Sequence, residues 1–165
     1  MFDNEAFGLA RTHQPLLFAA LALAPPGPVL EFGAGYGSTI VLHAVCAATG
    51  RQLLTVDNSS AWADRFAFLT TASHSILSVE DWEKISFVYN ESWAVVFIDH
   101  APAARRVVDM DRLAHGCEYM VVHDTEDAGY GYEPLLSQFK YRYDYKRMKP
   151  YTTIVSNRRE VPHDL

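Results

Sequence analysis

The chain has 165 residues, of which 49% are hydrophobic and 21% are charged, and its formal net charge at pH 7 is −6. This length suits one domain with a sizeable core, and the composition is typical of a globular protein rather than a disordered one. The negative charge argues against broad, non-specific attraction to nucleic acid. We therefore expect a single domain over residues 1–165, and we do not expect nucleic acid as its partner.

Hydrophobic periodicity and turn residues divide the chain into alternating helices and strands. In chain order, the pattern predicts a helix over 5–23, strand 29–32, helix 39–49, strand 53–56, helix 60–71, strand 74–79, a helical turn at 81–85, strand 94–98, helix 105–113, strand 119–122, helix 133–139, strand 141–145 and strand 152–155. Strands separated by helices form an open, mostly parallel sheet that is covered on both faces. The last two strands are close enough in sequence to form a hairpin.

No segment reads as a membrane span or a secretory signal. The apolar run over 15–24 ends in a proline cluster and is too short to cross a bilayer. The N-terminus carries Asp3 and Glu5 and lacks a basic region. Cys46 and Cys117 lie in apolar surroundings, where a free cysteine behaves as a small hydrophobic residue. We expect a soluble, cytoplasmic protein without a membrane partner.

The most specific feature is a glycine-rich loop directly after the first predicted strand. It consists of Gly33, Ala34, Gly35, Tyr36, Gly37, Ser38 and Thr39. Glycines at a strand-to-helix turn let the backbone approach a ligand closely and adopt positive φ. The hydroxyl of Ser38 or Thr39 can cap the helix that follows. A dinucleotide-binding turn has its third glycine where Ser38 stands here, so the spacing departs from that pattern.

The segment from Val29 to Thr39 resembles the cofactor-binding first motif of class I S-adenosylmethionine-dependent methyltransferases. The resemblance covers about residues 16–157 and implies an α/β fold. The implied fold has a Rossmann-like seven-stranded, mostly parallel sheet of strand order 3-2-1-4-5-7-6, with the last strand antiparallel and helices on both faces. The resemblance also implies that the glycine-rich loop binds S-adenosylmethionine, with Glu31 helping to hold the loop and the methionyl amine.

The same resemblance implies further cofactor contacts at the ends of the next two strands. An acid at the position of Asp57 binds the ribose in the family, and Asn58 is its neighbour. Asp81 and Trp82 stand where family members contact adenine, through a hydrogen bond and an aromatic face. Trp82 can equally be a buried core residue, because tryptophan is a common core side chain.

The segment 96–100, which ends in Asp99 and His100, is similar to catechol O-methyltransferase and to O-methyltransferases of the macrocin type. In that group the aspartate ligates a divalent cation, the next histidine lies along the adenine, and a second metal position matches Asp124. Carboxylates and water suit Mg²⁺. The third ligand of the catechol enzyme, an asparagine, is replaced here by Thr125, so Thr125, Glu126 or water would complete the set.

The lysine that serves as general base in the catechol enzyme falls at Pro102, which cannot act as a base. His100 and His123 remain as candidate bases, because only histidine titrates near neutral pH without perturbation. His123 can instead be a structural residue that points into the sheet, since neighbouring strand residues face opposite ways. The candidate catalytic residues are therefore His100, His123 and Asp124.

We expect a methyltransferase that uses S-adenosylmethionine to methylate an oxygen of a small molecule, with Mg²⁺ as a candidate second cofactor. Two other functions stay open. One is a cofactor-binding regulatory protein of the same fold without activity, and the other is a nicotinamide-dependent oxidoreductase. The stripe formed by Tyr141, Tyr143 and Tyr145 suits a core face or a contact between subunits of a homodimer.

Overall fold

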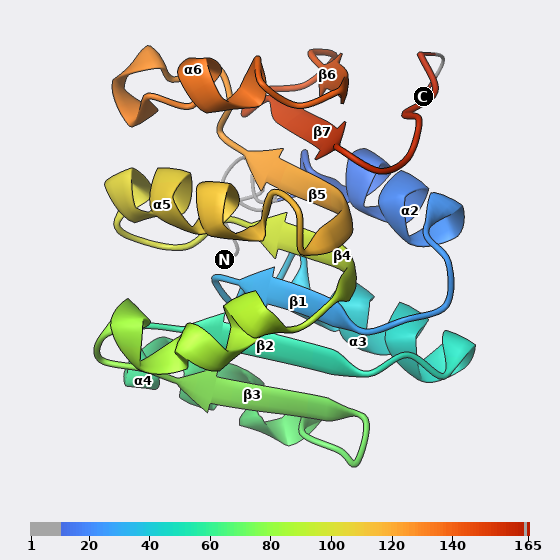
Figure 1. The fold of residues 1–165 in the computed structure, drawn as a ribbon. Helices are drawn as coiled ribbons and strands as arrows, with labels where there is room; N and C mark the ends of the chain where they lie inside the picture. Colours follow the sequence, from blue (N-terminus) through green and yellow to red (C-terminus); the bar gives the residue numbers. More distant parts are fainter. Residues whose placement is uncertain (1–10, 164) are drawn as a thin grey trace.

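The computed structural model describes residues 11–163 and 165 (Figure 1). Its seven strands form one sheet in the order β3-β2-β1-β4-β5-β7-β6, which confirms the predicted fold. The strands are β1 (Val29–Phe32), β2 (Leu53–Asp57), β3 (His74–Ser78), β4 (Trp93–Ile98), β5 (Cys117–His123), β6 (Tyr141–Tyr145) and β7 (Thr152–Ser156). The first five pair in parallel, and β7 runs antiparallel to both β5 and β6.

Helices cover both faces of the sheet, as Figure 1 shows. The helical segments are α2 (Gln14–Leu23), α3 (Thr39–Thr49), α4 (Ser60–Ala63), η1 (Asp64–Leu69), η2 (Trp82–Asn90), α5 (Ala103–Leu113), η3 (Ala128–Tyr130) and α6 (Glu133–Leu136). The η segments are 3₁₀ helices. Within the described residues, none of the helices has the length and apolarity to cross a membrane.

Alternate residues of each central strand enter two separate cores. In β4, Val96 and Ile98 pack with α5 and η2, whereas Val95 and Phe97 pack with α2 and α3. This alternation is the period of a β-strand, and both faces are apolar because the parallel strands are buried on both sides. The alternation therefore determines on which face of the sheet each side chain at a strand end lies.

Most predicted boundaries agree with the structure to within a few residues. Gly50 ends α3 in the left-handed conformation with φ 68°, as its position after the last helical residue predicts. Two differences are larger. Residues 82–90 form a 3₁₀ segment where the pattern predicted only a helical turn at 81–85. Helix α2 begins at Gln14, and the earlier part of the predicted helix, residues 5–10, lies outside the described residues.

The tyrosine stripe of β6 forms a core face. Tyr145 is buried, and Tyr141 and Tyr143 pack against the core that contains α2. Cys46 and Cys117 are both buried and free, as their apolar surroundings predict. The stripe therefore contributes to the packing of the domain itself.

Candidate active site

Strands β1, β2, β4 and β5 end at one edge of the sheet, and their registers bring the polar residues that follow them together. Phe32 is in register with Val56 and Ile98, and Ile98 is in register with Val122. The next residues along these strands are Gly33, Asp57, Asp99 and His123. This edge is where open parallel sheets bind their ligands.

The glycine-rich loop passes very close to the end of β4. Gly33 has φ 92°, and a Cβ at this position would lie 2.6 Å from the backbone oxygen of Asp99. A side chain there would meet both a backbone strain and a steric clash. Glycine at this position therefore allows the loop to pack against β4.

The start of α3 differs from the expected cap. Ser38 stands at the N-cap but makes no side-chain capping bond. The Thr39 hydroxyl instead accepts a hydrogen bond from the Gly35 backbone N–H at 2.8 Å. This bond ties the loop to the first turn of the helix, so the hydroxyl orders the loop rather than satisfying a donor inside the helix.

Asp57 joins the glycine-rich loop to the start of α4. Its two carboxylate oxygens accept hydrogen bonds from the backbone N–H groups of Ala34, at 2.9 Å, and Ser59, at 2.8 Å. An open pocket of about 320 Å³ lies beside it. The lining residues are Gly33, Ala34, Asp57, Asn58, Ser59, Trp62, Asp99, His100 and Ala101. Six of the residues predicted from sequence to bind a cofactor therefore line one pocket.

Of two tryptophans near the strand ends, one is buried in the core and the other lines the pocket. Trp82 is buried between Phe32 and His100, with ring centroids at 5.5 Å and 4.4 Å, and Asp81 is exposed and caps η2. Trp62 lines the pocket, and its indole N–H donates to the Ala34 carbonyl. Sequence reasoning missed Trp62. The signal was available, since Ser59 caps a helix after Asp57 and places residue 62 one turn later.

Glu31 lies in the core that contains α2 and α3, not among the residues that line the pocket. Its carboxylate accepts a hydrogen bond from the Thr55 hydroxyl at 2.7 Å, and Thr55 in turn contacts His74 Nε2 at 3.0 Å. Burial raises the pKa of Glu31 to about 7, although the nearby hydroxyls oppose this rise. The carboxyl is thus a buried group that titrates near neutral pH.

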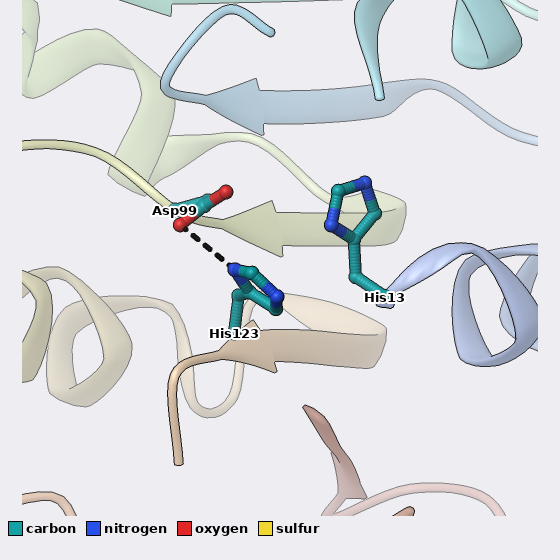
Figure 2. A group of neighbouring side chains, drawn as sticks. All are labelled: His13, Asp99 and His123. Atoms are coloured by element: carbon teal, nitrogen blue, oxygen red, sulfur yellow. Dashed lines mark hydrogen bonds and ion pairs between the residues drawn. The ribbon is translucent and has the colours of Figure 1, made fainter. Parts of the chain in front are cut away.

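On the other side of the edge, Asp99 and His123 face each other. His123 Nδ1 lies 3.3 Å from Asp99 Oδ1 (Figure 2). His123 Nε2 lies 2.9 Å from the hydroxyl of Thr12. Burial opposes the charged form of the imidazole, but the carboxylates of Asp99 and Asp124 raise the pKa of His123 above its usual value. The pair can therefore hold or accept a proton at Nδ1.

Arg106 is a site residue that sequence reasoning missed. Its guanidinium is buried and lies 3.2 Å from Asp99 Oδ1 and 2.9 Å from Asp124 Oδ2, and its Nε donates to the His100 carbonyl at 2.5 Å. The helical spacing of Arg106, Met110 and Leu113 puts the arginine on the core face of α5. An arginine at a core position of an amphipathic helix indicates a buried ion pair, and this signal was present in the sequence.

The four residues predicted to hold Mg²⁺ do not form a set of free oxygen ligands. Asp124 is paired with Arg106, Glu126 is exposed and accepts a hydrogen bond from the Tyr151 backbone at 2.6 Å, and the Thr125 hydroxyl accepts one from Thr153 at 3.0 Å. Mg²⁺ requires an octahedron of oxygens, and Thr125 and Glu126 are engaged with residues 153 and 151 instead of joining the two aspartates. These residues do not fit the ion, so no step is assigned to it.

His100 lies on the opposite face of the sheet from His123. Its imidazole is buried, its Nε2 lies 2.8 Å from Asp109 Oδ2, and its pKa is lowered by burial despite that carboxylate. Asp109 also accepts a hydrogen bond from Tyr89 at 2.6 Å. These contacts anchor α5 to the end of β4 and do not support a role for the imidazole as a base.

The sequence matches no family model, and no curated protein is similar to it in sequence. Solved structures do match its fold. The human methyltransferase 10 domain containing protein has a TM-score of 0.64 at 7% identity, and the match covers 90% of this chain and 83% of that chain. Precorrin-6y C5,15-methyltransferase from Geobacter metallireducens GS-15 has a TM-score of 0.57 at 9% identity and covers 87% of each chain.

A third match is the ribosomal protein L11 methylase from Lactobacillus delbrueckii subsp. bulgaricus, with a TM-score of 0.57 at 13% identity over 89% of this chain and 79% of that chain. This chain has the methyltransferase fold. At such low identity the likeness concerns the arrangement of strands and helices, while the chemistry must be argued from the residues at the strand ends. For this fold, those residues are the glycine-rich loop, Asp57 and the Asp99–His123 pair.

Proposed function

We propose that this protein is an S-adenosylmethionine-dependent methyltransferase that methylates an oxygen of a small molecule. The observation that carries the proposal is the pocket bounded by the glycine-rich loop and Asp57 on one side and by Asp99 on the other. A donor site and a proton acceptor thus share one edge of the sheet. The fold shared with three methyltransferases supports the methyltransferase part of the proposal, while the oxygen acceptor is argued from the residues of the site.

The first half of the pocket fits the nucleoside part of the cofactor. Asp57 is fixed by two backbone N–H groups and still has lone pairs for the ribose hydroxyls. The Trp62 indole offers an aromatic face to the adenine. When bound, the sulfonium of the cofactor supplies an activated methyl group. The protein then has to align the acceptor oxygen and remove its proton.

The second half of the edge supplies the proton acceptor. The Asp99–His123 pair would take the proton of the acceptor hydroxyl when the methyl group of the bound cofactor is transferred to the acceptor oxygen, which leaves S-adenosylhomocysteine. Arg106 holds Asp99 and Asp124 in place. A second pocket of about 410 Å³ follows Asp124 between Thr125 and Pro134, and its size suits a small acceptor.

Calorimetric titration with S-adenosylmethionine and S-adenosylhomocysteine tests the donor half. We expect both to bind, and Asp57→Asn to weaken both about 10- to 150-fold, because a hydrogen bond to a charged group contributes about 1.5–3 kcal/mol. Asp111→Asn, which changes an exposed carboxylate, is the matched control. Binding of reduced nicotinamide cofactors in place of either ligand would overturn the proposal in favour of an oxidoreductase.

Formation of S-adenosylhomocysteine with a panel of phenols and alcohols, in the presence and absence of a chelator, tests the acceptor half. We expect turnover with chelator present, and a loss of at least about 100-fold in His123→Gln at unchanged cofactor affinity, as for the loss of a general base. His115→Gln, an exposed histidine, is the control. Cofactor binding without turnover on any acceptor would instead favour a regulatory protein.

A further inference from the structure

We propose that His13, Asp99 and His123 form a binding site for a divalent transition metal ion of the Zn²⁺ type. The three side chains come from the start of α2, the end of β4 and the end of β5, and they face one another in Figure 2. This site differs from the oxygen set around Asp124 and Glu126, and it rests on the geometry of these residues rather than on the proposed methyl transfer.

The three groups are close enough to share one ion. One ligand atom from each side chain can be chosen so that all three lie within 4.8 Å of one another. The distance of 3.3 Å between His123 Nδ1 and Asp99 Oδ1 is long for a hydrogen bond. It equals the separation of about 3.3–3.4 Å that two ligands have around a tetrahedral Zn²⁺ with bonds of about 2.0–2.1 Å. Two imidazoles and one carboxylate are a ligand set typical of zinc.

The imidazole of His13 packs against the ring of Phe97, with centroids 4.7 Å apart, and its nitrogens have no hydrogen-bond partner among the described residues. The side chain is only 2% exposed. The Gly37 carbonyl, which also lies beside His13, accepts a hydrogen bond from the Gln14 amide at 2.7 Å. One ring nitrogen is turned toward Asp99 and His123 in Figure 2. A buried imidazole without a hydrogen-bond partner is costly, and an ion beside it would remove that cost.

A hydrogen bond orients the imidazole of His123 for metal binding. The Thr12 hydroxyl lies 2.9 Å from His123 Nε2 and can accept its hydrogen, which directs the lone pair of Nδ1 toward Asp99. Metal-binding histidines are commonly oriented by such a hydrogen bond on the second nitrogen.

Arg106 does not block the site. Both contacts of Asp99 with described side chains, to Arg106 and to His123, use Oδ1, and Arg106 has Asp124 as a second carboxylate partner. An ion between Asp99 and His123 would therefore replace the proton that the pair shares, while Arg106 keeps Asp124. Because the ligands must be deprotonated, binding of the ion releases this proton.

The site leaves one coordination position open. Three protein ligands with a fourth position for water or a substrate oxygen are the pattern of catalytic rather than structural zinc. Asp99 also lines the pocket beside Gly33 and Asp57, and its side chain is 25% exposed. Asp99 therefore links the proposed site to that pocket, and a hydroxyl or carboxylate oxygen of a ligand would suit the open position.

The test is titration of the chelator-treated full chain with ZnCl₂ alone, followed by calorimetry, metal analysis after desalting, and thermal unfolding. We expect one equivalent of Zn²⁺ with proton release and a rise in Tm that depends on Zn²⁺ concentration. His13→Gln and His123→Gln should each lower the affinity by at least about 100-fold, and Thr12→Val by about 10- to 100-fold.

His43→Gln is the matched control, because His43 and His74 form the other close pair, with their Nδ1 atoms 3.0 Å apart. Loss of Zn²⁺ in this variant but not in His13→Gln would overturn the proposal, as would a wild-type chain that binds no Zn²⁺. Far-UV circular dichroism and S-adenosylhomocysteine binding check the fold of each variant. If neither variant of the triad folds, the visible absorption of the Co²⁺-loaded wild type decides, since a tetrahedral site gives intense bands and an octahedral aquo ion does not.

Discussion

The two halves of the strand-end edge are held in place in different ways. In the cofactor half, Asp57 accepts hydrogen bonds from backbone N–H groups, and the loop is positioned by a glycine that allows close contact with β4. In the acceptor half, Asp99 and Asp124 are held by the side chain of Arg106, and His123 by those of Asp99 and Thr12. The first half relies on backbone geometry and the second on charges that balance one another.

If the acceptor half depends on charge balance, Arg106→Met should have the largest effect on stability. The substitution leaves two partly buried carboxylates without their cation, and breaking such a pair costs about 3–5 kcal/mol. Urea unfolding of the ligand-free protein measures this loss. Arg112→Met is the control, because Arg112 pairs with exposed Glu83 and such a pair contributes about 0–1 kcal/mol. Equal costs for the two variants would contradict the charge-balance interpretation.

If the cofactor half depends on backbone geometry, Gly33→Ala should cost more than Gly50→Ala. Both glycines have positive φ, which costs an alanine about 1–2 kcal/mol. Only at Gly33 would the added Cβ also meet the backbone of Asp99, and such overpacking adds about 1–3 kcal/mol. At Gly50 nothing lies within 4 Å of the added atom. The same urea unfolding experiment measures both variants. Similar losses in the free energy of unfolding would show that β4 can move away from the added Cβ at little cost.

Glu31 should make the stability of the ligand-free protein depend on pH. Burial raises the pKa of its carboxyl from 4.5 to about 7, so the folded state binds the proton more tightly than the unfolded state. Stability should therefore fall as pH rises from about 4.5 to 7, by up to about 3 kcal/mol relative to Glu31→Gln. Unfolding curves of both proteins across this range give the difference. A constant difference between them would mean that the carboxyl titrates normally.

The smallest effect concerns the aromatic face of the pocket. Trp62→Leu should weaken S-adenosylmethionine binding about 2- to 12-fold, since aromatic stacking adds about 0.5–1.5 kcal/mol beyond area burial. Phe68→Leu, at a side chain that is 72% exposed, should leave the affinity unchanged. Calorimetry compares the two. An unchanged affinity in Trp62→Leu would place the adenine elsewhere along the edge.

The same contrast explains what could be predicted for the site. Gly33 and Asp57 were found from sequence because each stands at the end of a predicted strand and acts through neighbouring backbone. The sequence left Trp82 open between an adenine contact and a core residue, because only packing shows whether its ring is buried. The helical register of Arg106 predicts that it lies on the core face of α5, but it does not predict which carboxylates the guanidinium contacts.

The sequence by itself determined the strands and helices, the position of the glycine-rich loop and the polar residues at the strand ends, because these follow from local periodicity and turn chemistry. The strand order came from the resemblance to class I methyltransferases and not from periodicity. The tertiary structure decided which of those residues touch. It placed His13 beside Asp99 and His123, Arg106 between two carboxylates, and His100 on the opposite face. Such contacts join residues far apart in the chain, so only the packing of α2 and α5 against the sheet fixes them.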